Sequence, residues 1–339
     1  MTMREAFVVL VLLVCSSCAN LRHADTLTEQ CTRLVVGSCV ARRDDALWEE
    51  ISEFHPDAIV LTGDTVYHTA QSMRSASDAR ELYTSVYGSP SFARVKQSTP
   101  ILAAIDDHDF GSDNSDSSNP WALYTVPSFL EFWEIGSFEK GPTPLSFVKS
   151  VGGVEVLVTD GRTQRRNREG EQPTLFGVEQ WLWIESYVMK ESAVPLVLVS
   201  GTPLLVTDDS RESLAQFPAD ERRLFHLLES SNRPVVLVSG DAHFGEINQV
   251  VFPEKSIIEL SASPLAAPVR SLDAIEKNMY RVRGPVASEL FGILDICGTG
   301  SHTKFSAGLF SRSTGETVSY SWGGESRPKS GLLPVEAGL

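Results

Sequence analysis

Basic residues are scarce in this 339-residue chain. There are 29 Lys and Arg against 44 Asp and Glu, which gives a formal net charge of −15. Such an acidic chain repels polyanions, so we expect no nucleic-acid-specific partner and no attraction to an anionic membrane surface. If the ligand is itself an anion, then bound metal ions or a few arginines must overcome the overall field.

Internal repeats and linkers are also absent, and only residues 112–119 are rich in Ser, Asp and Asn. Hydrophobic residues make up 42% of the chain and charged residues 22%, which excludes global disorder and predicts a sizeable core. No Gly-x-Ser-x-Gly motif is present, which argues against an α/β hydrolase with a serine nucleophile. We expect one domain over residues 31–325, and a monomer.

The N-terminal apolar segment is too short to span a membrane. Residues 6–14 form an unbroken run of nine apolar residues, and small residues follow from Cys15 to Cys18. This length is typical of a signal peptide, whereas a membrane-spanning helix needs roughly 20 residues. We therefore predict a signal peptide over residues 1–18 and export to the periplasm or the extracellular space, the alternative being a buried N-terminal strand. Cys18 after two serines resembles a bacterial lipoprotein cleavage site, which would anchor the protein to a membrane through a lipid.

Cysteine is rare as well, with five residues in the whole chain. Cleavage before or after Cys18 leaves Cys31, Cys39 and Cys297 in the body of the protein. An odd number of thiols in an oxidising compartment means that they cannot all pair with one another. A bridge between Cys31 and Cys297 is one arrangement, but sequence does not determine the pairing.

Short apolar segments alternate with helical ones through most of the chain. The expected strands cover 34–36, 58–61, 101–105, 195–199, 234–238 and 256–260, with a hairpin over 146–158. The expected helices cover 44–54, 78–87, 178–189 and 219–229. Residues 291–322 alternate as antiparallel strands do. This order predicts an α/β fold of layered, mixed β-sheets.

Potential metal ligands follow four of the strands at the point where each ends. They are Cys39, then Asp64 with Tyr67, then residues 106–109, then Asp241 with His243. In open α/β sheets the carboxyl ends of the strands are where ligands bind, so we expect these side chains to meet. Carboxylates, an imidazole and a thiolate or phenolate are suited to holding a pair of cations.

Each of these pieces has a simpler explanation when taken alone. Asp64 follows a glycine and could be an ordinary turn residue or helix cap, and His243 could be a buried structural histidine. Residues 106–109 place three acids around one histidine, which is electrostatically costly without cations. The joint occurrence at four strand ends favours a metal centre over four unrelated features.

Six motifs in the same order resemble those of the alkaline phosphatase D-type (PhoD-like) metallophosphatases, a branch of the calcineurin-like phosphoesterases. They are Gly37-Ser38-Cys39, Gly63-Asp64-Thr65-Val66-Tyr67, residues 106–111 (DDHDFG), Asp160-Gly161-Arg162 with Arg165, residues 176–183 (FGVEQWLW) and Ser239-Gly240-Asp241-Ala242-His243-Phe244. The resemblance runs from about residue 33 to residue 310. It implies a metallophosphoesterase-type sandwich of two mixed β-sheets flanked by helices.

The resemblance also implies roles for single residues. The implied metal ligands are Cys39, Tyr67 and His243 on the first metal, Asp107 and Asp241 on the second, and Asp64 between the two. The implied catalytic residues are His108 as general acid and Asp109, which holds it. The implied contacts to the phosphate oxygens come from Arg162 and Arg165.

The donor atoms indicate which metals the two sites prefer. A thiolate and a phenolate stabilise a strongly Lewis-acidic ion such as Fe³⁺, whereas an all-oxygen site suits Ca²⁺. We therefore expect a dinuclear Fe³⁺ and Ca²⁺ site, with other divalent metals as alternatives. Two cations that share a carboxylate would lower the pKa of a bridging water and give a hydroxide for attack on phosphorus.

The predicted function is metal-dependent hydrolysis of phosphate mono- or diesters, of the alkaline phosphatase or phosphodiesterase type. The alternative is a catalytically degenerate exported lipoprotein that acts as a binding module. Ile105 in place of the family's usual Trp, and the order Asp113-Asn114, leave room for that alternative. The intact set of clustered ligands argues against it, because such costly charges are retained for a function.

Overall fold

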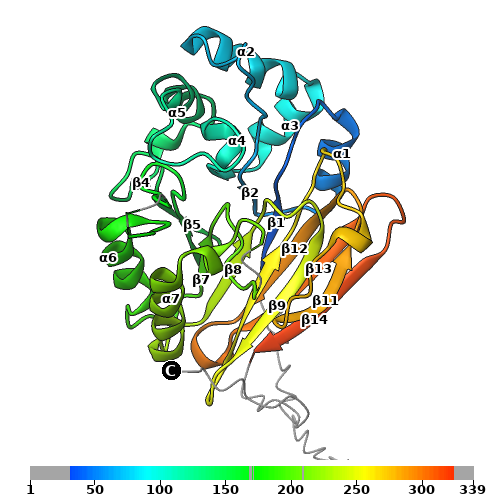
Figure 1. Cartoon of the computed structure of the whole chain (residues 1–339). Coiled ribbons are helices and arrows are strands. Elements are labelled where there is room, and N and C mark those ends of the chain that lie inside the picture. Colours follow the sequence, from blue (N-terminus) through cyan, green and yellow to red (C-terminus); the bar gives the residue numbers. More distant parts are fainter. Residues whose placement is uncertain (1–30, 168–169, 171, 208–209, 324–339) are drawn as a thin grey trace, which may run out of the picture.

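The computed structural model describes residues 31–167, 170, 172–207 and 210–323. The predicted signal peptide, residues 1–18 with Cys18, lies outside the described residues, as do residues 324 and 325 of the predicted domain. Among the described residues, no helix has the length and hydrophobicity needed to cross a membrane. Two mixed β-sheets pack against each other, and helices cover them on the outside (Figure 1).

The first sheet has six strands in the order β14-β13-β12-β1-β2-β3. Their bounds are β1 Cys31–Gly37, β2 Ala58–Thr62, β3 Ile101–Ala104, β12 Leu290–Cys297, β13 Lys304–Ser311 and β14 Thr317–Gly323. β1, β2 and β3 are parallel, and β12 to β14 run antiparallel beyond β1. The parallel strands β2 and β3 are buried along their whole length, which explains their continuous apolar sequence.

The second sheet has eight strands in the order β11-β9-β10-β8-β7-β6-β5-β4. Their bounds are β4 Glu139–Lys140, β5 Phe147–Val151, β6 Val154–Val158, β7 Leu196–Val199, β8 Val235–Ser239, β9 Gly245–Val251, β10 Ser256–Ser261 and β11 Arg281–Val286. β6, β7, β8 and β10 are parallel to one another. One core cluster contains residues of both sheets, for example Val36, Ile59, Val197 and Val236.

Seven α-helices flank the sheets in the described part of the chain. They are α1 Asp45–Glu53, α2 Ala76–Tyr87, α3 Pro90–Ser98, α4 Asp107–Phe110, α5 Ala122–Phe132, α6 Gly177–Val188 and α7 Pro218–Ser230. α6 and α7 cover the second sheet through a separate core cluster that includes Trp181 and Leu224. The predicted fold class, a sandwich of two mixed sheets with flanking helices, is confirmed.

Six of the described α-helices and strands were not predicted from the sequence pattern: α3, α4, α5, β4, β9 and β11. α3 is short and begins at a proline after the Ser89 cap, and α5 contains Pro127, which normally argues against a helix. β9 is buried on both faces for most of its length, so its sequence lacks the alternation that marks a half-exposed strand.

Cys31 and Cys297 form a disulfide, which settles the pairing that the sequence left open. The two residues are partners across the β1–β12 register, with 4.2 Å between their Cα atoms. Cys39 is the free cysteine among the described residues, and it is buried.

We expect the double variant Cys31→Ala/Cys297→Ala to lose about 2–5 kcal/mol of unfolding free energy, because the bridge closes a long loop and restricts the unfolded chain. Urea unfolding measures this loss. A reductant should destabilise the parent protein and leave the double variant unchanged. Equal stability of the two proteins under non-reducing conditions would contradict the prediction.

Candidate metal centre

The loops after β1, β2 and β3 are joined by hydrogen bonds, and the loop after β8 approaches them closely. The Cys39 amide donates to the Gly63 carbonyl at 3.2 Å, and the Val40 amide to the Asp64 carbonyl at 2.8 Å. The second sheet joins through the Gly240 loop, where an added Cβ would lie 2.5 Å from the Thr62 carbonyl oxygen. Only glycine permits this approach, so Gly240 brings the Asp241 loop against the first sheet.

Four of the predicted ligands have left-handed backbone conformations that non-glycine residues rarely adopt. The φ angles are 61° at Cys39, 51° at Asp64, 60° at Asp241 and 61° at His243. Each such residue costs roughly 1–3 kcal/mol, and such strain gathers at functional sites. These four residues lie on three loops, and the surrounding hydrogen bonds hold the loops in shapes that direct the side chains toward one another.

The first group of donor atoms contains Cys39, Asp64 and His243, whose ligand atoms lie within 4.8 Å of one another. The Cys39 Sγ is 3.9 Å from Asp64 Oδ2. The Tyr67 hydroxyl lies 3.1 Å from His243 Nε2, which brings the fourth predicted ligand to the same place. His243 Nδ1 contacts the Pro268 carbonyl, and a proton donated there leaves Nε2 as the lone-pair donor for a cation.

The second group is built from carboxylates. Asp64 and Asp107 cluster with His108, and Asp107 also clusters with Asp106 and Asp241, again within 4.8 Å. The His108 backbone amide donates to both Asp64 Oδ1 and Asp107 Oδ1, at 3.1 and 2.9 Å. Asp64 thus belongs to both groups, as a ligand shared by two cations must.

Burial and mutual repulsion make this cluster unfavourable as a set of bare anions. Burial raises the pKa of the Cys39 thiol to about 12, and the charge of Asp241 adds to the effect. Burial followed by repulsion from Asp107 raises the pKa of Asp64 well above its usual value. Burial likewise raises the pKa of Asp241 to about 8. Bound cations would reverse these shifts, because they stabilise the ionised ligands.

The donor set fits two cations of different character. One group offers a thiolate, a phenolate, an imidazole and a carboxylate, and the other offers mainly carboxylates, with the His108 imidazole beside them. Asp106 Oδ2 is buried and has no hydrogen-bond partner among the described residues, which is costly for a carboxylate oxygen unless an ion satisfies it. Asp106 was not among the predicted ligands.

Asp109 has a different environment from the one the resemblance implies. Its carboxylate accepts hydrogen bonds from the backbone amides of Thr65, Val66 and Asp106 and from the Thr65 hydroxyl. Among the described residues, no hydrogen bond joins it to the His108 imidazole, which stacks on Tyr67 with 4.3 Å between ring centroids. Asp109 therefore holds the loop that carries Asp64 through hydrogen bonds, while the ring contact with Tyr67 orients His108.

Arg162 also lies elsewhere than expected. Its guanidinium is fully buried and forms ion pairs with Asp106 and Glu212, so it presents no free face to a phosphate. The Gly201 backbone lies against Asp106, since an added Cβ there would be 2.6 Å from its carboxyl carbon. Arg165 pairs with Glu212 as well, but it lines the open cavity.

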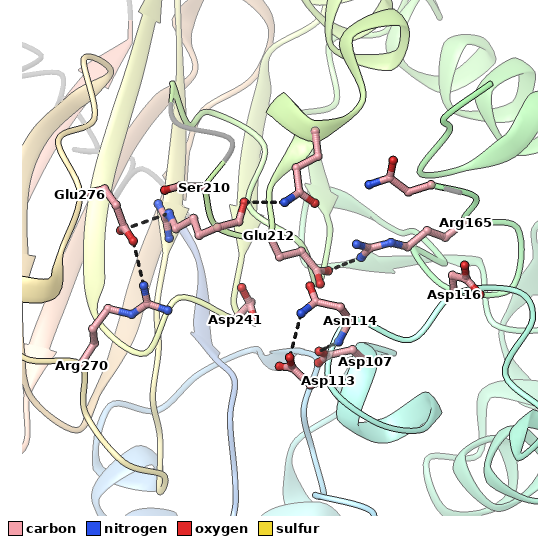
Figure 2. A pocket seen from close by; sticks show the side chains of 13 residues that line it. Asp107, Asp113, Asn114, Asp116, Arg165, Ser210, Glu212, Asp241, Arg270 and Glu276 are labelled. Carbon is pink, nitrogen blue, oxygen red and sulfur yellow. Dashed lines mark hydrogen bonds and ion pairs between the residues drawn. The ribbon is translucent and has the colours of Figure 1, made fainter. Parts of the chain in front are cut away.

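A cavity of about 510 Å³ opens at the carboxylate side of the cluster. Asp107 and Asp241 point into it, between Arg165 with Glu212 on one side and Arg270 with Glu276 on the other (Figure 2). Six carboxylates and three arginines line it. Without cations this excess of negative charge would repel an anionic ligand, and two divalent cations would reverse its sign.

Sequence reasoning missed two charged residues of this region, Glu212 and Arg211, and gave no individual role to Asp106 within residues 106–109. Asp106 carried a signal, since it begins the DDHD run. Glu212 and Arg211 do not directly follow a predicted strand, and they line the cavity from the segment that contains the short helix Leu214–Gln216.

No family model matches the chain, and no curated protein matches its sequence. Solved structures do match. A structure of PhoD aligns with 86% of this chain and 68% of its own, at 15% identity and a TM-score of 0.65. The purple acid phosphatase PPD1 from seeds of yellow lupin (Lupinus luteus) aligns with 88% of this chain and 54% of its own, at 11% identity and a TM-score of 0.61. This chain thus spans about half of the lupin enzyme. The likeness to PhoD is confirmed at the level of the fold, which this chain also shares with the lupin phosphatase.

Proposed function

We propose that this chain is a metal-dependent hydrolase of phosphate mono- or diesters. One observation carries the proposal: Asp64 lies in two groups of potential metal ligands, one with Cys39 and His243 and one with Asp107 and His108. The fold is shared with a structure of PhoD and with a purple acid phosphatase, which supports the same chemistry.

Cys39, Tyr67, His243 and Asp64 would hold the first metal, and Asp64, Asp107 and Asp241 the second, with Asp106 close by. We propose Fe³⁺ and Ca²⁺ respectively, from the thiolate and phenolate of one group and the oxygen donors of the other. When bound, the pair supplies Lewis-acid polarisation of the phosphoryl group and lowers the pKa of a water molecule.

The side chains beside the cluster would bind the ester and move its proton. His108 is half-buried next to Asp64 and Asp107, where its imidazole can protonate the leaving oxygen, a contribution of about 10²–10⁴-fold. Its face rests on Tyr67, which limits its rotation. Arg165 lines the cavity and would contact phosphate oxygens. Arg162 would act indirectly, by holding Asp106 and Glu212 in place.

We further propose that the protein is exported and works in the periplasm or outside the cell. The Cys31–Cys297 disulfide supports this, because disulfides persist in oxidising compartments. A lipid on Cys18 and a monomeric state stay predictions.

Metal analysis followed by a panel of aryl phosphate mono- and diesters tests the function. We expect close to two metal ions per chain and hydrolysis of at least one ester, and removal of the metals by a chelator should abolish the activity. Protein that binds metals without turnover would support the degenerate binding module instead. Protein that holds no metal and cleaves no ester would refute both the proposed centre and the proposed function.

A further inference from the structure

Arg211 has two buried donors without a hydrogen-bond partner among the described residues, whereas Arg165, which lines the same cavity, has one. The Arg211 side chain is 5% exposed, yet its Nε and Nη1 have no hydrogen-bond acceptor among the described residues. A buried guanidinium with unpaired N–H groups is costly, so such groups in native proteins call for a partner. Arg211 lines the same cavity as Asp107 and Asp241, from which an anionic ligand could supply that partner.

The rest of the Arg211 side chain is held firmly. Nη2 donates to Glu246 Oε1 at 2.9 Å, and Glu246 is itself fully buried on β9. The guanidinium lies 5.1 Å from the centroid of the Phe244 ring. On the backbone, the Arg211 carbonyl accepts a hydrogen bond from Gln216 Nε2. The two free donors therefore have a fixed direction before any ligand arrives, which reduces the entropy lost on binding.

The charges around Arg211 leave room for an anion. Arg270 and Arg281 lie in the same network, which Glu246 and Glu276 only partly neutralise, so one net positive charge remains. Glu276 pairs with Arg270 at 3.1 Å, while its other oxygen is 3.9 Å from Arg211 Nε, too far for a hydrogen bond. Arg165 on the opposite side is already neutralised by Glu212 (Figure 2).

We propose that Arg211, with Arg270 beside it, binds a second anionic group of the substrate. The preferred substrates are then phosphate esters whose alcohol part carries its own carboxylate or phosphate. This inference rests on the proposed function, because it places the scissile phosphoryl group at the Asp107–Asp241 part of the cavity. A volume of about 510 Å³ accommodates such a molecule, since pockets for small molecules measure about 300–1,000 Å³.

Three matched substrates test the inference: phenyl phosphate, 4-carboxyphenyl phosphate and 1,4-phenylene bisphosphate. We expect Arg211→Gln to lower kcat/KM about 10- to 100-fold on the two substrates with a second anion, mainly through KM. On phenyl phosphate the same variant should change kcat/KM less than about threefold. The two charged substrates tell a carboxylate-binding site from a phosphate-binding one.

Arg281→Gln is the matched control. Arg281 shares both structural partners of Arg211, with Nε 2.6 Å from Glu246 and its guanidinium 5.7 Å from the Phe244 ring, but it does not line the cavity. It should leave the preference among the three substrates unchanged. If Arg211→Gln does not fold, Arg211→Lys is the alternative variant. The lysine keeps a positive charge opposite the Glu246 carboxylate but lacks the fixed pair of donors, so it should show the same selective loss.

A binding measurement separates the failure of this inference from failure of the proposed function. 4-Carboxyphenylphosphonate should raise the melting temperature of the metal-loaded protein more than phenylphosphonate does, and Arg211→Gln should remove the difference. Equal shifts in the parent protein, or equal kcat/KM losses on all three substrates, would overturn the inference even if phenyl phosphate is hydrolysed. If no ester is cleaved but the difference in melting temperature is present, the result supports the anion-binding subsite and refutes the proposed hydrolase activity.

Discussion

Asp64→Asn is expected to lose both metals and to lower kcat on the order of 10³-fold or more. The carboxylate belongs to both donor groups, so its replacement by a neutral amide weakens both at once. Metal ions stabilise the transition state by several kcal/mol, and each 1.36 kcal/mol corresponds to a factor of ten in rate. Elemental analysis and steady-state kinetics on an aryl phosphate measure the two effects.

The structure also predicts how this variant behaves without metal. Repulsion from Asp107, Asp106 and Asp109 contributes to the raised pKa of Asp64, so removing its charge should not lower the unfolding free energy of the metal-free protein. A loss of activity with intact folding would then be a loss of metal binding.

Asp113→Asn is the matched control, because Asp113 lines the same cavity but belongs to none of the donor groups. Cys39→Ser should deplete the first metal only. Full metal content in Asp64→Asn would refute the shared-ligand assignment.

Arg162→Met is expected to cause a large loss of stability, about 3–5 kcal/mol of unfolding free energy. Arg162 is fully buried between Asp106 and Glu212, and removing one partner of a buried ion pair leaves an uncompensated charge. Glu212 keeps its pair with Arg165, so most of the cost falls on Asp106, whose Oδ2 already lacks a hydrogen bond. Urea unfolding of chelator-treated protein measures the loss.

Chelation matters in that experiment because a bound cation could replace Arg162 beside Asp106. Added metal should therefore restore part of the lost stability in Arg162→Met. Arg43→Met serves as the control, since Arg43 pairs with Asp45 on the exposed surface, and it should produce no measurable change. A similar small effect in Arg162→Met would show that the buried network contributes little to stability.

The clustering of the candidate metal ligands could be predicted from the sequence for a simple geometric reason. Asp64 and Asp107 follow adjacent parallel strands, whose carboxyl ends lie at one edge of a sheet. A cluster of acids around His108 is hard to explain without a cation, and the order of the motifs resembles that of one family. Local sequence was therefore sufficient to find Cys39, Asp64, Tyr67, Asp107, Asp241 and His243, which the structure brings together.

The roles of Asp109 and Arg162 could not be read in the same way. Both lie in motifs that suggest contact with the reacting groups, but each side chain points into the protein. Asp109 caps the Thr65 loop, and Arg162 neutralises Asp106 and Glu212. Their direction depends on which buried partner is near, and Glu212 is fifty residues away from Arg162 along the chain.

The sequence by itself determined an α/β fold of layered, mixed sheets and the donor atoms at the strand ends, because hydrophobic pattern and strand polarity are local properties. The sandwich of two sheets followed from the resemblance of the motifs. Only the tertiary structure decided the Cys31–Cys297 bridge, the buried Arg162 network and the position of Arg211 in the cavity wall. Those features depend on pairing between residues far apart in the chain. Burial then determines how much each charge contributes to the free energy of folding. For Asp64 both levels agree: its place after β2 makes it a candidate ligand, and the packing of the loops places it in two of the donor groups.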